Sequence, residues 1–280
     1  MKKISRRSFL AAAGLSVAAL ALTACGGSSA SSTASSVASS AASSEAASTS
    51  AAAGELTTVE AGKLTMATNA AFPPYEMTTD AGEFEGIDID TAKAIAEKLG
   101  LELQIDDMDF DAALLSVQQG KADIVMAGVT VTDERKAVMD FSDSYATGIQ
   151  SIIVPEGSDI ASPDDLSGKK IGTQRGTTGY IYCSDDFGDE NVVAYDDGLT
   201  AVQALNNGQV DAVVIDNAPA KEFIAANPGL VILETSYAEE DYAIGLAKGS
   251  SLEDAINAAL EELQADGTLQ AIVDKYITAE

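Results

Sequence analysis

A short pattern occurs twice in this chain, and it narrows the folds that the chain can adopt. Segments 117–125 (VQQGKADIV) and 205–213 (LNNGQVDAV) each place the end of a helical run, a glycine and an apolar run in the same order. Glycine commonly ends helices because it enters the left-handed backbone region without a steric cost. A continuous apolar run after the glycine is typical of a strand buried on both faces. The repeat therefore predicts two similar lobes, each with its own sheet.

The region from residue 59 onward alternates short β-branched runs with helical patterns, which is typical of α/β folds. Apolar residues at helical spacing occur in 89–99, where Gly100 is the expected helix end, and again in 252–263. The alternation predicts mixed sheets flanked by helices. Strands are expected at 64–67, 101–105, 124–126, 170–173, 192–195 and 212–215.

Residues 1–24 have the pattern of a signal peptide. Four basic residues at positions 2 to 7 precede an apolar run at 9–22, which is too short to span a bilayer. The run ends in Leu-Thr-Ala-Cys, which resembles a bacterial lipobox. Cys25 is therefore predicted to be the lipidated first residue of the mature chain, anchored at the outer face of the cell membrane. The alternative is an ordinary cleaved signal with an incidental cysteine.

Residues 25–58 are predicted to form a disordered linker. After Cys25 almost every residue up to position 58 is Ser, Ala or Thr, and nothing there can form a core. A coil of this length reaches roughly 30 Å, enough for a folded domain to sample the membrane surface. Segment 5–10 (SRRSFL) also resembles the twin-arginine export motif, so the Sec and Tat routes both remain open.

The charge balance and the residue inventory exclude several classes of function. The chain has 44 acidic and 16 basic residues, for a net charge of -28, which would repel a phosphate backbone. Histidine is absent, which removes the usual catalytic triads and imidazole metal ligands. We therefore expect no nucleic-acid partner, no metal and no cofactor. Cys183 is interpreted as a half-buried small residue of a helix without a redox role.

Polar residues follow the strand of each repeat. In open α/β sheets, ligands bind beyond the carboxyl ends of the strands. Thr130 and Arg135 follow the first repeat strand, and Asp216 follows the second. An arginine fork holds a carboxylate and an aspartate accepts from an ammonium group, so the pair suits the zwitterion of an α-amino acid. The alternatives are that Arg135 is exposed at a helix start and that Asp216 only caps the next helix.

Several further motifs occur in an order that resembles a known family. They are 69–75 (NAAFPPY), 86–96 (GIDIDTAKAIA), 108–110 (MDF), 127–135 (AGVTVTDER), 140–143 (DFSD), 176–178 (GTT) and 266–268 (DGT). Together they resemble the polar amino acid-binding proteins of bacterial ABC importers, extracellular solute-binding protein family 3. The likeness runs from about Leu64 to Tyr276, with one departure at Thr91, where an apolar residue is usual.

The resemblance implies the two-lobed type II fold of periplasmic binding proteins, with two mixed sheets flanked by helices and two hinge strands. Lobe 1 is expected at 59–147 plus 245–280, and lobe 2 at 148–244. The chain should cross between the lobes near 146–150 and 242–245. A monomer that closes around its ligand by a hinge motion is expected.

The resemblance also implies roles for particular residues. Arg135 is expected to hold the ligand α-carboxylate, together with Thr130 and Thr178. Asp216 and the carbonyl group of Gly128 are expected to accept from the ligand ammonium group. No catalytic residue is expected among them.

Four other positions are expected to contact the ligand side chain. Phe72 and Phe110 should sandwich it, although two ordinary core aromatics are the alternative. Asn69 stands where relatives that bind glutamine or basic amino acids often have an acidic residue, and Gln174 or Arg175 should also reach the ligand. An uncharged amide at position 69 favours glutamine, glutamate or cystine over a strongly basic ligand.

The expected function is therefore that of a membrane-anchored extracellular binding protein, which delivers a polar amino acid to the permease of an ABC importer. An enzyme is one alternative, because some dehydratases resemble this family and could use carboxylates in place of histidine. A sensory module that reports its ligand to a membrane receptor is another.

Overall fold

The computed structural model describes residues 56–277 of the 280-residue chain. The predicted signal peptide, Cys25 and the linker up to residue 55 lie outside the described residues. Within 56–277, none of the helices combines the length and the apolar character that crossing a bilayer requires. Strands and helices alternate along this part of the chain, as expected of an α/β protein.

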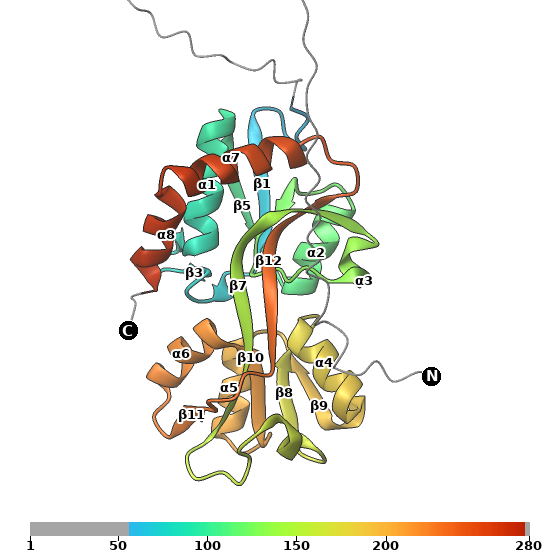
Figure 1. Ribbon diagram of the computed structural model, residues 1–280, viewed down its shortest axis with the longest axis vertical. Coiled ribbons are helices and arrows are strands. Elements are labelled where there is room, and N and C mark those ends of the chain that lie inside the picture. The colour runs from blue at the N-terminus through green and yellow to red at the C-terminus, as the bar shows by residue number, and fades with distance from the viewer. Residues whose placement is uncertain (1–55, 278–280) are drawn as a thin grey trace, which may run out of the picture. The chain divides into compact units, whose positions relative to one another are not determined.

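The described strands form one large mixed sheet in the order β5-β1-β6-β12-β7-β10-β8-β9, with β11 paired to β7 (Figure 1). They are β1 (Lys63–Thr68), β5 (Glu102–Asp107), β6 (Ile124–Val125), β7 (Met139–Pro155), β8 (Ile171–Gln174), β9 (Val192–Tyr195), β10 (Ala212–Asp216), β11 (Leu230–Ile232) and β12 (Ala238–Ala247). A small separate sheet contains β2 (Ala71–Phe72), β3 (Glu76–Thr78) and β4 (Phe84–Glu85). The six strands predicted from the sequence are confirmed, with small differences at their ends.

Strands β7 and β12 connect the two halves of the large sheet. They contain 17 and 10 residues and pair antiparallel with each other. On their outer sides β12 pairs with β6, and β7 pairs with β10. The sequence predicted two separate sheets, whereas these hydrogen bonds join them into one. The reason is that a strand as long as β7 has backbone groups to satisfy along its whole length, in both halves.

The helices lie in two groups at the two ends of β7 and β12 (Figure 1). The first group contains α1 (Ile87–Leu99), α2 (Phe110–Gln118), α7 (Glu253–Ala265) and α8 (Thr268–Tyr276), and the second contains α4 (Thr178–Phe187), α5 (Gly198–Asn206) and α6 (Asn217–Ala226). The short helix α3 (Asp133–Lys136) contacts β7, and single 3-10 turns lie at Pro163–Leu166 and Asp189–Asn191. The helices predicted from 89–99 and 252–263 are confirmed as α1 and α7.

The two copies of the repeated pattern adopt the same local structure. Gly120 follows α2 with a φ of 65°, and Gly208 follows α5 with a φ of 66°. The Gly120 N–H donates to the carbonyl of Val117 at 2.9 Å. The Gly208 N–H donates to that of Leu205 at 3.0 Å. Each glycine therefore ends a helix as predicted, and each is followed by a fully buried strand, β6 or β10.

Two buried residues show how closely the strands and helices pack. Tyr242 on β12 is fully buried, and its ring lies edge-on to Tyr75 with the centroids 5.3 Å apart. A Cβ atom at Gly148 on β7 would lie 2.4 Å from this ring, so only glycine leaves room for it.

Cys183 in α4 is fully buried rather than half-buried as predicted, because it packs into an apolar cluster with Ile152. Burial raises the pKa of its thiol to about 12.

Candidate functional site

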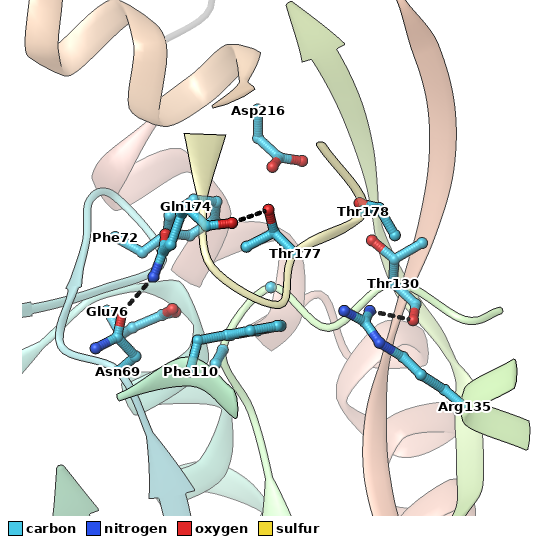
Figure 2. A pocket seen from close by; sticks show the side chains of 12 residues that line it. Asn69, Phe72, Glu76, Phe110, Thr130, Arg135, Gln174, Thr177, Thr178 and Asp216 are labelled. Atoms are coloured by element: carbon cyan, nitrogen blue, oxygen red, sulfur yellow. Dashed lines mark hydrogen bonds between the residues drawn. The ribbon is translucent and has the colours of Figure 1, made fainter. Parts of the chain in front are cut away.

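Twelve described residues line a cavity near the carboxyl ends of β1, β6, β8 and β10 (Figure 2). They are Asn69, Phe72, Glu76, Phe110, Ala127, Gly128, Thr130, Arg135, Gln174, Thr177, Thr178 and Asp216. Nine of the residues named from the sequence are among them, and Arg175, the alternative to Gln174, is not. The nine come together because the strand ends that they follow meet at one place. Glu76, Ala127 and Thr177 are the additional three.

The lining residues come from two stretches of the chain. Those within 69–135 are called the N-terminal wall here, and those within 174–216 the C-terminal wall. In Figure 2, Asp216 of the C-terminal wall lies above Asn69, Phe110 and Arg135 of the N-terminal wall. A hydrogen bond joins the walls directly, from Gln174 Nε2 to Asn69 Oδ1 at 2.9 Å. The cavity is therefore bounded by side chains that lie about 105 residues apart in the sequence.

Arg135 is buried in the N-terminal wall, with 8% of its surface exposed. Helix α3 holds its backbone, since the Thr132 hydroxyl accepts from the Arg135 N–H. Its guanidinium donates to the carbonyl of Thr130 at 2.7 Å and to that of Gly176 at 3.2 Å, and it lies 5.3 Å from the centre of the Phe110 ring. The alternative of an exposed arginine at a helix start is therefore wrong.

Asp216 occupies the N-cap position of α6, yet its side chain makes no capping hydrogen bond. Its carboxylate accepts instead from the Tyr242 hydroxyl and, at 2.8 Å, from Gln150 Nε2. Burial raises the pKa of this carboxyl to about 7, and the nearby charge of Glu240 also raises it, although the two hydrogen bonds act in the opposite direction. The interpretation of Asp216 as only a helix cap is therefore wrong.

Phe72 and Phe110 each belong to a buried apolar cluster and also line the cavity. Phe72 lies against Gly128, where a Cβ atom would be 2.9 Å from the Phe72 ring. Gly128 also has a φ of 55°, which side chains rarely adopt, so two constraints require glycine there. Its N–H donates to Asp88 Oδ2 at 3.0 Å. The position of the Phe72 ring beside the cavity thus depends on a glycine at position 128.

Of the two polar candidates before the Gly176 loop, Gln174 lines the cavity and Arg175 does not. Gln174 is only 3% exposed, and its amide donates to Asn69 and, at 3.4 Å, to the carbonyl of Asp196. Arg175 is half-exposed and pairs with the Asp196 carboxylate at 3.3 Å. Gln174 is therefore the residue that can reach a molecule in the cavity.

Glu240 on β12 is a buried carboxylate that the sequence did not reveal. Its Oε2 atom accepts from the hydroxyls of Thr130 at 3.2 Å and Thr178 at 3.0 Å, and from Gln150 Nε2 at 3.0 Å. The run Glu239-Glu240-Asp241 is typical of an exposed acidic edge, and only the alternation of β12 turns its middle residue inward. Glu240 therefore contacts hydroxyls of both walls.

Glu76 is a further acidic residue that lines the cavity. It is fully buried on β3, and none of the described N–H or O–H groups donates to either of its carboxyl oxygens. Burial holds the pKa of Glu76 well above its usual range, and the neighbouring Asp88 carboxyl raises it further. Burial also raises the pKa of Asp88, to about 6. A strand of only three residues carries no pattern that predicts such a position.

Acidic residues outnumber basic ones around the cavity. Arg135 is the only basic residue among the twelve described residues that line it, whereas Glu76 and Asp216 line it too. Asp88 and Glu240 contact the lining residues from outside. A molecule with one carboxylate for Arg135 and at least one positive group for the carboxylates would complement this arrangement. An α-amino acid has both groups.

Comparison with known proteins gives consistent matches over the described region. The model of the bacterial extracellular solute-binding proteins, family 3, matches residues 64–279. The L-cystine-binding protein TcyJ of Escherichia coli (strain K12) is 33% identical over 226 residues, which are 79% of this chain and 85% of that protein.

Solved structures are similar too. An ancestral arginine-binding protein bound to glutamine is 42% identical, with a TM-score of 0.74, over 78% of this chain and 99% of that one. An ancestral arginine-binding protein bound to arginine is 43% identical, with a TM-score of 0.73, over 77% of this chain and 98% of that one. The fold is thus the type II fold of periplasmic binding proteins that the motifs predicted.

Proposed function

This chain belongs to family 3 of the bacterial extracellular solute-binding proteins, and we propose that it captures a polar amino acid in its cavity and delivers it to an ABC importer. The relatives are solute-binding proteins and not enzymes, so the dehydratase alternative is set aside. The observation that carries the proposal is that Arg135 and Asp216 line the same cavity from opposite walls.

Two polar regions of the cavity, around Arg135 and around Asp216, match the two charged groups of an amino acid. The ligand α-carboxylate would accept from the Arg135 guanidinium and from Thr130 and Thr178. Thr178 is the first residue of α4, where backbone N–H groups lack partners within the helix and favour an anion. The ammonium group would donate to Asp216 and to the carbonyl of Gly128. Every α-amino acid offers these two groups, so this part of the site would not discriminate among side chains.

Binding would be coupled to closure of two lobes around the ligand. We propose lobe 1 at 59–147 plus 245–280 and lobe 2 at 148–244, with hinges in β7 and β12. The hydrogen bond from Gln174 to Asn69 supports this, because it joins residues of the two lobes across the cavity. A ligand that contacts both lobes stabilises the closed form selectively, and the importer could then distinguish loaded from empty protein.

The sequence favours glutamine, glutamate or cystine as the ligand, and the acidity of the cavity refines this choice. A glutamate side chain would meet Glu76, which is buried without a donor, so a second carboxylate there is disfavoured. Side chains that end in N–H donors would satisfy Glu76. Similar structures with glutamine and with arginine support this class. We therefore propose an amino acid whose side chain ends in an amide or a cationic group.

Membrane attachment is part of the proposal. Lipidated Cys25 would hold the mature chain at the outer face of the membrane, with residues 26–58 as a tether, after export by Sec or Tat. Mass spectrometry of the membrane fraction should find a diacylglyceryl adduct on Cys25. The Cys25→Ser variant should be released into the medium, and an unmodified Cys25 in membrane-bound protein would contradict the anchor.

The function is tested by a calorimetric screen of the purified chain against the twenty common amino acids and L-cystine. We expect at least one to bind with a dissociation constant in the range of about 1 μM, equivalent to roughly 8 kcal/mol. The Arg135→Met variant should lose that binding, while Arg175→Met, which removes an exposed arginine outside the cavity, should keep it. Failure of every compound in the panel to bind would refute the proposal.

A further inference from the structure

We propose that Glu76 and Asp88 share one proton while the cavity is empty, and that a cationic ligand side chain takes the place of that proton. The inference rests on the proposed function and deepens it, because it makes proton release a property of one class of ligand. The proposed function uses Glu76 only as an acceptor for the ligand side chain and does not use Asp88.

The geometry of the pair carries the inference. Glu76 and Asp88 are both fully buried, in β3 and α1. Asp88 Oδ2 accepts from the Gly128 N–H at 3.0 Å and from the Tyr145 hydroxyl at 2.8 Å. Asp88 Oδ1 and both oxygens of Glu76 have no donor among the described residues. The backbones that carry the two carboxyls are adjacent, because the Asp88 N–H donates to the carbonyl of Tyr75, the neighbour of Glu76, at 2.9 Å. Each carboxyl acts on the other, and a shared proton would make their contact favourable.

None of the described groups that act on the pair carries a positive charge. Acidic groups act on Glu76 from two further strands, Asp107 at the end of β5 and Asp216 at the end of β10. Tyrosine hydroxyls act on the pair from the chain before β3 (Tyr75) and from β7 (Tyr145). Two buried like charges this close cannot both ionise without a cation, so one proton remains with the pair at neutral pH.

A ligand can supply the missing cation because Glu76 lines the cavity. Arg135, on the same wall, would be engaged by the ligand α-carboxylate and so cannot neutralise Glu76. A guanidinium or ammonium group at the end of the ligand side chain would donate to Glu76 and stabilise its ionised form. The Glu76 O–H bond then breaks, its electron pair stays on the carboxylate, and the proton passes to the buffer. A neutral amide has no net charge with which to drive this exchange.

The experiment compares L-arginine with L-citrulline, which has nearly the same shape and no side-chain charge. Titration calorimetry of the chain at pH 7 in buffers of different ionisation enthalpy gives the number of protons released per ligand. Asp216 also titrates near pH 7 and would release protons when the ammonium group binds, but equally with both ligands. We expect arginine to release about one proton more than citrulline, since one shared proton is replaced.

The Glu76→Gln variant keeps the shape of the protonated residue and removes the exchangeable proton. It should abolish the difference in proton release between the two ligands. It should also weaken the binding of arginine about 10- to 100-fold and change the affinity for citrulline less than about threefold. The comparison of the two ligands on the unmodified chain stands even if this variant does not fold.

Each remaining outcome bears on one of the two proposals. Arginine binding with the same proton release as citrulline overturns the shared proton. Binding of glutamine or citrulline without binding of arginine, lysine or any other cationic amino acid also overturns it, and leaves the proposed function standing. Failure of every amino acid to bind refutes the proposed function itself.

Discussion

Glu76 and Glu240 are both buried carboxyls beside the same cavity, but their surroundings differ completely. Glu240 Oε2 accepts from three donors supplied by both walls, although its Oε1 has none. No N–H or O–H group of the described residues donates to either oxygen of Glu76. Burial alone therefore does not decide what a carboxyl does; the number of donors around it decides. Glu240 is built into the fold, whereas Glu76 is left for a group that the chain does not supply.

The same contrast separates the two ends of the cavity. At the end near Glu240, Arg135 and two threonine hydroxyls are held in place by hydrogen bonds within the protein. That end can receive the carboxylate common to all amino acids with little rearrangement. At the end near Glu76, acidic groups gather without a cation. This end is therefore the one that would read the ligand side chain.

The largest effect is expected from replacing Arg135, the cation at the end of the cavity near Glu240. Arg135→Met should weaken every amino acid that binds by about 3 kcal/mol or more, over 100-fold, because it leaves the ligand carboxylate buried without its charged partner. Arg135→Lys should recover part of this loss, since it restores the charge but not the planar fork. Calorimetry of both variants checks the order. If Arg135→Met and the unmodified chain bound amino acids with equal affinity, Arg135 would not be the partner of the ligand carboxylate, and the contrast between the two ends would not rest on it.

A smaller loss is expected from Asp216→Asn, about 2 kcal/mol or roughly 30-fold, because the ligand ammonium would lose its charged acceptor. The pKa of Asp216 is raised to about 7 in the empty protein, so its protonation should compete with the ammonium. Affinity should therefore fall as the pH drops below 7. Binding measured from pH 5 to 8 should show this fall in the unmodified chain and a weaker one in Asp216→Asn.

Glu76 and Asp88, at the other end of the cavity, should also set how the stability of the empty protein depends on pH. The pKa values of Glu76 and Asp88 are raised on folding, so in the window above their unfolded values the folded state binds more protons than the unfolded state. Their stabilising contribution is complete below about pH 4 and is lost as the pH rises through their folded pKa values. Glu76→Gln should reduce this slope by up to about 1.4 kcal/mol per pH unit. Urea unfolding at several pH values measures it, and an unchanged slope would count against the raised pKa.

The smallest effect is expected from Glu240→Gln. A glutamine still accepts from the Thr130 and Thr178 hydroxyls but weakens both bonds, so all amino acids should lose about 1 kcal/mol, or fivefold, alike. Glu239→Gln, at the exposed neighbouring position on β12, is the matched control and should change nothing. A selective loss for one class of side chain would show that Glu240 reads the side chain as well.

Much of the fold follows from short-range patterns. The ends of α2 and α5 were predicted from the glycines at 120 and 208, and both glycines have nearly the same φ in the structure. The strand ends located Arg135 and Asp216, because β6 and β10 run in opposite directions and their carboxyl ends face the same cavity from its two sides. The full length of β7 was not predictable, since buried and exposed residues alternate irregularly along its first half.

The sequence by itself determined six strands, the helices α1 and α7, the ends of α2 and α5, and the positions where polar side chains leave the sheet, because these depend on periodicity and on hydrogen bonds between near neighbours. Only the tertiary structure decided how each buried carboxyl is partnered. Glu240 meets Thr130 across 110 residues, and Asp88 meets Tyr145 across 57. The pKa of a buried group depends on every dipole and charge around it, and long-range strand pairing, rather than local sequence, brings those groups together.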